Sequence, residues 1–182
     1  MRRLNIKKLI RNTPNHHRIS FDEVTRDYQG ISLEIGAGTG MHPLRYAKKN
    51  PDKFIIAIEK TTERYGKFKR DFEKRNLRNL LPIHAHAMSW VCHNISASSV
   101  DEIFILYPNP NPKTKDLNKR WHAMPFFGHL IDILKSGGRI LIRTNEKFYA
   151  DEAKKFMENV WSLSVEMYGF SIEDVDEFKT LF

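Results

Sequence analysis

Hydrophobic positions along this chain form short, uninterrupted runs that alternate with longer segments in which apolar residues recur every three or four positions. The first pattern is typical of strands buried on both faces of a sheet, and the second of helices that pack on such a sheet. The runs predict strands over residues 31–35, 54–59, 81–84, 102–107 and 139–143, with one more over 163–170. The amphipathic segments predict helices over 42–50, 63–75, 125–135 and 148–161. We therefore expect an α/β fold with a central, mostly parallel sheet and helices on both faces.

The alternation divides the chain of 182 residues into three segments of one expected domain. They are a basic arm with a short helix (1–30), the α/β core (31–170) and an acidic amphipathic tail (171–182). No apolar run approaches the ~20 residues that span a membrane, so we expect no membrane association. The single cysteine, Cys92, cannot form an internal disulfide, which favours the cytoplasm. His16 and His17 have no third ligand at useful spacing, so we expect no metal site; the sequence indicates no particular oligomeric state.

Three alternate glycines, Gly36, Gly38 and Gly40, follow the first predicted strand. Such a turn lets backbone N–H groups approach a ligand closely, and the following helix N-terminus favours negative charge. Glu59 ends the next strand, about 20 residues later, where a carboxylate accepts hydrogen bonds from the ribose hydroxyls of a bound cofactor. A nicotinamide dinucleotide and S-adenosylmethionine both suit this arrangement, and an ordinary βα turn is the plain alternative. Glu34, two positions before the first glycine, favours the cationic S-adenosylmethionine, because it can lie near the sulfonium and amino groups and would repel a pyrophosphate.

A proline-rich loop, residues 107–113, follows the fourth predicted strand. Prolines at alternate positions fix φ and disfavour the helical region for the residues before them, so the loop is expected to be stiff and extended. It presents Asn109 and Asn111 at the edge where the carboxyl ends of parallel strands meet, which is where ligands bind in such sheets. The Lys/Arg-rich stretch over 113–120 is predicted to hold phosphates.

Positively charged residues outnumber negatively charged ones in residues 1–149, whereas the remaining residues are acidic. Residues 1–149 contain 27 Lys and Arg against 14 Asp and Glu, whereas residues 150–182 contain 3 against 8. The cations gather at the N-terminus and along the second predicted helix; they are Arg2, Arg3, Lys7, Lys8 and Arg11, and Lys60, Arg64, Lys67, Lys69, Arg70, Lys74, Arg75 and Arg78. Such a field attracts polyanions, and together with the cofactor turn it favours RNA or DNA as a substrate over a merely solvated basic surface.

These motifs together resemble the bacterial tRNA (guanine-N7)-methyltransferase family. The matching residues are, in chain order, Glu34-Ile35-Gly36-x-Gly38-x-Gly40, Ala57-Ile58-Glu59, His86-Ala87, Tyr107-Pro108-Asn109-Pro110-Asn111-Pro112-Lys113, Lys119-Arg120, Leu134-Lys135-Ser136-Gly137-Gly138 and Thr144-Asn145 with Tyr149. The resemblance implies a Rossmann-like class I methyltransferase fold, S-adenosylmethionine as cofactor and tRNA as substrate. It assigns cofactor binding to Glu34, Gly36, Gly38, Gly40, Glu59, His86, Ala87 and Asn109, a catalytic role also to Asn109, and substrate binding to Lys113, Thr144 and Asn145.

The chain departs from the family pattern at the acceptor positions. Asn109 and Asn145 stand where the family has aspartate, Asn111 where it has tryptophan, and His86 where it has an acid or amide. A carboxylate accepts both N1–H and N2–H of guanine, whereas an asparagine amide offers one acceptor oxygen. The family's C-terminal T-x-F-E element also has no clear counterpart. Two alternatives therefore stay open: methylation of another RNA base or an amino group, and a non-catalytic protein that binds RNA or the cofactor.

Overall fold

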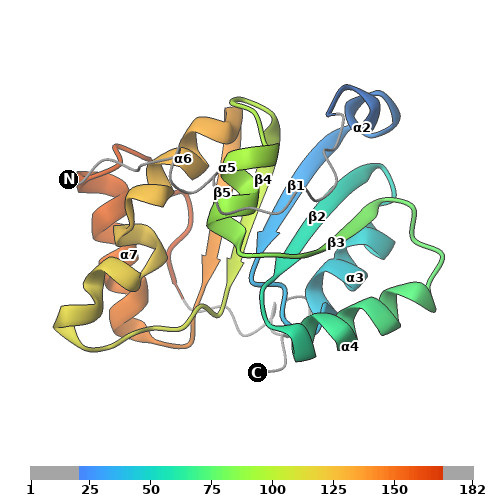
Figure 1. Ribbon diagram of the computed structural model, residues 1–182. Helices are drawn as coiled ribbons and strands as arrows, with labels where there is room; N and C mark the ends of the chain where they lie inside the picture. The colour runs from blue at the N-terminus through green and yellow to red at the C-terminus, as the bar shows by residue number, and fades with distance from the viewer. Residues whose placement is uncertain (1–20, 170–182) are drawn as a thin grey trace.

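The structure, a computed structural model, describes residues 21–169, and side chains from residue 24 onward. The predicted tail and most of the predicted arm, including His16, His17 and the N-terminal cations, lie outside the described residues. The described part contains a five-stranded, all-parallel sheet in the order β3-β2-β1-β4-β5 (Figure 1). Its strands are β1 (Gly30–Ile35), β2 (Lys53–Glu59), β3 (Leu80–His84), β4 (Val100–Leu106) and β5 (Leu134–Arg143). The α/β fold with a parallel sheet is confirmed.

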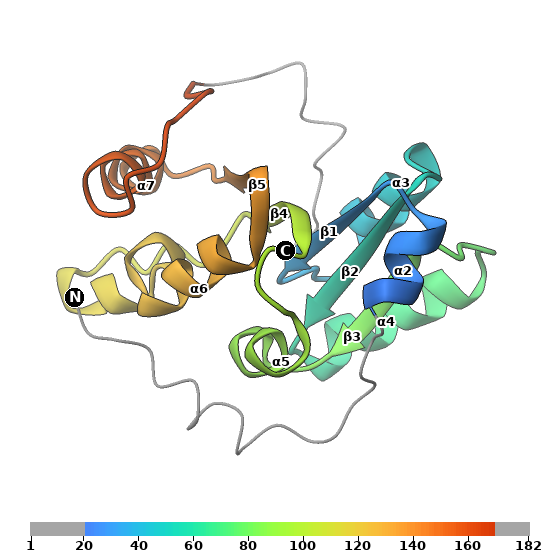
Figure 2. The ribbon, with the colours of Figure 1, turned by 90° about the horizontal axis from the view of Figure 1, so that it is seen from above.

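Helices cover both faces of the sheet. They are α2 (Phe21–Asp27), α3 (Met41–Lys49), α4 (Thr62–Glu73), α5 (Ala87–Asn94), α6 (Pro125–Ile133) and α7 (Lys147–Asn159), and two 3₁₀ turns, η1 (Thr114–Lys119) and η2 (Trp121–Ala123), join β4 to α6. Helices α3 and α4 lie on one side of the sheet and α5 and α6 on the other, while α7 lies beside α6 at the β5 end (Figure 2). No helix of the described residues is long and apolar enough to cross a membrane.

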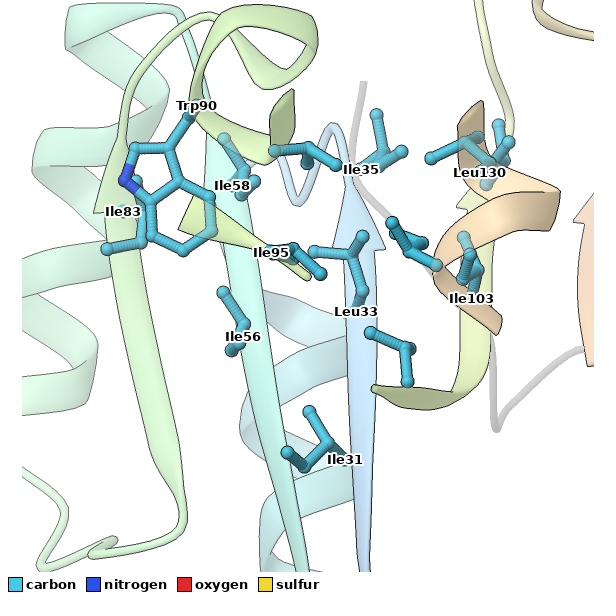
Figure 3. Packing of buried hydrophobic residues seen from close by; sticks show 14 of the residues in the cluster. Ile31, Leu33, Ile35, Ile56, Ile58, Ile83, Trp90, Ile95, Ile103 and Leu130 are labelled. Atoms are coloured by element: carbon cyan, nitrogen blue, oxygen red, sulfur yellow. The ribbon is translucent and has the colours of Figure 1, made fainter. Parts of the chain in front are cut away.

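The core forms two layers because side chains alternate along each strand. Ile31, Leu33 and Ile35 of β1 face α5 and α6, where Trp90 and Leu130 complete the larger cluster (Figure 3). The smaller cluster lies under α3 and α4 and includes Ile55, Ala57, Leu44 and Phe68. Every residue of β1 is buried, as its uninterrupted apolar run predicts, but the run conceals one buried carboxylate, that of Glu34.

The observed elements differ from the predicted ones in three places. The helix over 125–135 ends earlier, at Ile133, and the glycines at 137 and 138 lie within β5, where the pairing with β4 shifts register and Gly137 has a φ of +77°. They therefore form an irregularity of the strand. The strand over 163–170 was wrong for its described part, because residues 163–169 contain no strand and Met167 remains 81% exposed. Helix α5 was not predicted, because only Trp90 and Val91 mark its buried face.

Candidate cofactor and acceptor site

The sheet brings the predicted site residues to one edge. His86 follows β3, Glu59 ends β2, the glycine turn follows β1, the proline loop follows β4 and Thr144 follows β5. This edge is the lower one in Figure 1, where the strands end. The strand order reverses between β1, which continues to β2, and β4, which is reached by a long crossover. A ligand crevice is expected at this switch point, with the glycine turn on one side and the proline loop on the other.

The glycine turn needs its glycines for different reasons. Gly36, Gly38 and Gly40 have φ values of +79°, +58° and +81°, a region that other residues rarely adopt. A Cβ at Gly40 would lie 2.0 Å from the ring of Phe68, so this glycine lets α3 start against α4. A Cβ at Gly36 would meet no heavy atom within 4 Å. The space beside Gly36 is therefore open, as close approach of a cofactor requires.

Glu59 holds the glycine turn and retains acceptor capacity for a ligand. It is 4% exposed; its Oε2 accepts a hydrogen bond from the N–H of Gly38 at 2.9 Å, and its Oε1 accepts one from the N–H of Thr61 at 2.7 Å. Each carboxylate oxygen accepts two hydrogen bonds, so both oxygens can accept one more. This geometry fits two ribose hydroxyls.

Glu34 forms a buried pair that the sequence did not reveal. Its Oε2 lies 2.7 Å from Nδ1 of His42 on α3, and both side chains are almost completely buried. Its other oxygen, Oε1, is buried without a hydrogen-bond partner in the described part of the chain. An unpaired buried carboxylate oxygen is costly, so a cationic ligand group that donates to it would be stabilised there. This carboxylate thus fits a cofactor that carries positive charge.

His86 and Ala87 lie at the far end of the cofactor side. His86 caps α5, and its carbonyl accepts a hydrogen bond from the N–H of Trp90 at 3.0 Å. Partial burial and the nearby charge of Lys60 lower the pKa of its imidazole, which favours the neutral ring. A neutral ring nitrogen can accept a hydrogen bond from an adenine amino group. The N–H of Ala85 donates to the carbonyl of Glu59 at 3.1 Å, which joins this end to the rest of the edge.

The proline loop carries exposed amides and a strained backbone. Asn109 is exposed, and its Oδ1 accepts a hydrogen bond from the N–H of Asn111 at 3.2 Å. Tyr107 and Asn111 have φ values of +47° and +46°, which for a bulky residue such as tyrosine costs about 1–3 kcal/mol. The N–H of Tyr107 donates to the carbonyl of Arg143 at 2.7 Å, so the loop begins beside the end of β5.

The remaining acceptor residues lie on the same side. Lys113 is exposed and precedes η1, and Asn145 is exposed just after β5. Thr144 is partly buried, and its Oγ1 accepts a hydrogen bond from the N–H of Glu146 at 3.1 Å. The fold therefore collects the predicted acceptor residues at β4 and β5, and the predicted cofactor residues, Asn109 excepted, at β1, β2 and β3.

Arg120 fixes the proline loop from inside the protein. It is 5% exposed, and its Nε donates to the carbonyl of Asn111 at 3.1 Å. One terminal nitrogen donates to the carbonyls of Pro112 and Lys113 at 3.2 and 3.4 Å, and the other to both oxygens of Glu152 on α7 at 2.7 and 2.6 Å. All five donors of the guanidinium are thus engaged. The prediction that the stretch over 113–120 holds phosphates was wrong for Arg120, which binds the loop itself.

Glu152 and His122 complete this buried cluster. Nε2 of His122 lies 2.7 Å from Oε2 of Glu152, and His122 is completely buried. Burial opposes ionisation of Glu152, but hydrogen bonds from Arg120 and His122 outweigh it and lower the pKa of this carboxyl. Burial also lowers the pKa of His122, against the attraction of Glu152. The sequence offered no signal for this cluster, because Glu152 lies 32 residues from Arg120.

The fold and this edge define a Rossmann-like methyltransferase architecture. Among solved structures, precorrin-6y C5,15-methyltransferase from Geobacter metallireducens superposes with a TM-score of 0.55 at 18% identity, over 81% of this chain and 74% of that one. At that identity the likeness concerns the fold alone.

The family follows from sequence comparison. A family model described as "Putative methyltransferase" matches residues 28–169, so the chain belongs to this family. The tRNA (guanine-N(7)-)-methyltransferase of Chlamydia abortus is 27% identical over 139 residues, 76% of this chain and 62% of that protein. The protein of the same name from Nitrosomonas europaea is 35% identical over 118 residues, 65% of this chain and 53% of that protein. The motif-based resemblance is confirmed, and the chain spans a little over half the length of these relatives.

Proposed function

We propose that this chain transfers a methyl group from S-adenosylmethionine to N7 of a guanine in transfer RNA. The cofactor would supply a methyl group activated by a sulfonium. Glu59 and the glycine turn would hold its ribose, Glu34 would receive its positively charged end, and His86 and Ala87 would border its adenine. The support for this assignment is the fit described above: an open space at Gly36, spare acceptor capacity on Glu59 and an unpaired buried oxygen on Glu34.

The acceptor side supports a reaction that depends on positioning. Guanine N7 carries an in-plane lone pair and no proton, so its methylation needs no general base. The contribution of the protein would be to orient the base and to exclude water. A loop held by a fully engaged guanidinium suits that task, with Asn109, Lys113, Thr144 and Asn145 as the groups that contact the nucleotide.

One observation carries the proposal. A turn suited to the cofactor and a rigid acceptor loop face each other across the point where the strand order reverses, in a chain whose curated relatives bear the name tRNA (guanine-N(7)-)-methyltransferase.

A second candidate, methylation of a different base, is favoured by the exposed amides of Asn109 and Asn145. Each amide has only one acceptor oxygen for the paired donors of guanine, and that of Asn109 is already hydrogen-bonded to Asn111.

A single experiment tests both candidates. Calorimetric titration with S-adenosylmethionine is followed by transfer of radiolabelled methyl groups to bulk tRNA and by digestion to nucleosides. We expect binding, and label in 7-methylguanosine. Label in another nucleoside would support the second candidate, and absence of cofactor binding would overturn both.

A further inference from the structure

Phe148 is an exposed aromatic residue on the acceptor side of the edge. It lies in the first turn of α7, three residues after Asn145, and is 37% exposed. The two core clusters of the described residues form without it. Its position therefore requires an explanation other than core packing.

The ring of Phe148 is supported from one side by the buried cluster. The guanidinium carbon of Arg120 lies 5.4 Å from the ring centroid, within the range of a cation–π contact. Arg120 cannot move freely, because its donors are committed to the proline loop and to Glu152. The ring of buried Tyr149 meets Phe148 edge-on at 6.5 Å. Phe148 is thus a fixed ring with part of its surface open to solvent.

Unpaired cations lie on the loop that Arg120 holds. Lys113 and Lys115 are exposed and form no ion pair within residues 24–169. Lys147, next to Phe148, is instead paired with Asp151 at 2.7 Å. The loop with these cations and the ring of Phe148 are joined through Arg120, which contacts both. Cations and an exposed aromatic ring on one surface are the combination by which proteins bind single-stranded nucleic acid, the cations holding phosphates and the ring stacking a base.

We propose that Phe148 is a stacking platform for an unpaired base of the RNA acceptor. The base lies on the exposed part of the ring and extends the stack that Arg120 begins. This inference rests on the proposed function, since it names a residue that would orient the nucleotide presented to the cofactor side. The competing explanation is that Phe148 only shields the ion pair between Arg120 and Glu152 from water.

Two substitutions separate stacking from shielding. Phe148→Leu keeps an apolar cover but removes the aromatic face, whereas Phe148→Trp keeps and enlarges it. With bulk tRNA as the probe, we expect Phe148→Leu to raise KM about tenfold and Phe148→Trp to remain near the wild type. The melting temperature and the affinity for S-adenosylhomocysteine should be unchanged in both. In Phe148→Trp, tRNA should also quench the added tryptophan fluorescence.

Val160→Ala is the matched control, because Val160 is 44% exposed and lies just after the other end of α7. Wild-type KM in Phe148→Leu would overturn the stacking role, as would a loss of melting temperature that accounts for the whole effect. If the wild-type protein transfers no methyl group to tRNA, the proposed function fails separately. Phe148 is then judged by filter binding of tRNA, where equal affinities of wild type and Phe148→Leu overturn the inference.

Discussion

The two halves of the candidate site, at the edge where the strands end, are held by buried groups of opposite charge. On the cofactor side, the carboxylate of Glu59 accepts hydrogen bonds from backbone N–H groups of the glycine turn and of Thr61, the residue before α4. On the acceptor side, the guanidinium of Arg120 donates to backbone carbonyls of the proline loop. Glu59 keeps spare acceptor capacity and can serve a ligand as well as the fold, whereas Arg120 has no donor left. Under the proposed function, contact with the acceptor would therefore come from residues that Arg120 supports.

The halves also differ in the sequence separation between the residues that are hydrogen-bonded to each other. Gly38 and Glu59 are 21 residues apart, in consecutive βα units. Arg120 and Glu152 are 32 residues apart, and Glu152 belongs to α7, which lies at the β5 end of the sheet. The hydrogen bonds of Glu59 thus need only β1, β2 and the turns that follow them, whereas the anchor of the proline loop, Arg120, also needs a partner on α7. The following predictions test this difference.

Arg120→Ala should have the largest effect. It leaves three loop carbonyls without their donor and the Glu152 carboxylate with His122 as its remaining partner. Removing one member of a fully buried ion pair costs about 3–5 kcal/mol, and because the Glu152 side chain is 27% exposed, the lower half of that range applies. We expect the free energy of unfolding, measured with urea, to fall by that amount. Lys119→Ala is the control: Lys119 is 68% exposed in its ion pair with Asp116 and should contribute less than about 1 kcal/mol. Equal effects of the two variants would contradict the structural role of Arg120.

Gly40→Ala and Gly36→Ala should distinguish an effect on stability from an effect on cofactor binding. In Gly40→Ala the added Cβ lies against Phe68 at a positive φ, so the free energy of unfolding should fall by about 3 kcal/mol. Gly36→Ala carries only the strain of its φ, about 1–2 kcal/mol, but fills the open space beside the turn. The folded Gly36→Ala variant should also bind S-adenosylhomocysteine more weakly, an effect that its lower stability does not explain. Unaltered affinity in the folded Gly36→Ala variant would exclude close approach of the cofactor there.

Glu59→Gln should weaken the cofactor half selectively. The glutamine amide places an NH₂ group against one backbone donor and loses acceptor capacity for a hydroxyl. We expect roughly 100-fold weaker binding of S-adenosylhomocysteine by calorimetry, because two hydrogen bonds to a charged group are weakened together. Glu63→Gln, at an exposed position in the first turn of α4, is the control and should bind as the wild type does. A small loss in Glu59→Gln would remove Glu59 from the ribose site.

Reversing two charges on α4 should weaken the binding of RNA molecules of any nucleotide sequence. Lys67 and Arg70 are exposed and form no ion pair within the described part of the chain. In the variant Lys67→Glu/Arg70→Glu we expect about tenfold weaker tRNA binding and a salt dependence reduced by about two counterions. The control Arg26→Glu/Lys48→Glu changes the net charge by the same amount, but its two residues, on α2 and in the last turn of α3, lie toward the opposite edge of the sheet. If both variants weaken binding alike, only net charge matters.

The smallest expected effect is a loss of stability in mild acid. Burial holds the pKa of His122 below its ordinary value of 6.5. Near pH 6.5 the imidazole is therefore protonated in part of the unfolded molecules but stays neutral in the folded protein. Stability is therefore complete above about pH 6.5 and decreases below it, by at most about 1.4 kcal/mol per pH unit for one proton. Urea unfolding at pH 7.5 and 5.5 measures the slope. His122→Gln should flatten it; an unchanged slope would assign the effect to other histidines.

Most strands and helices could be predicted from the sequence, as could the glycine turn and the position of Glu59 at the end of β2. Buried parallel strands appear as continuous apolar runs, and the turn after β1 is marked by glycines that positive φ values require. Glu59 could be singled out because it ends β2, the strand that follows the glycine turn in the next βα unit. Since strands of this kind end at one edge, the meeting of Gly36, Glu59, Asn109 and Thr144 also followed from the pattern.

Which polar residues are buried, and what they bind, became apparent from the folded structure alone. Arg120 belongs to a cationic stretch in the sequence, yet it lies inside the protein because Glu152 neutralises it from α7. Likewise, the pairing of Glu34 with His42 and the placing of Phe148 over Arg120 depend on how helices dock on the sheet. Periodicity records which face of an element is apolar, because burial of each apolar residue is favourable by itself. The partner of a buried charge is chosen by geometry across the fold, and so it leaves no local mark.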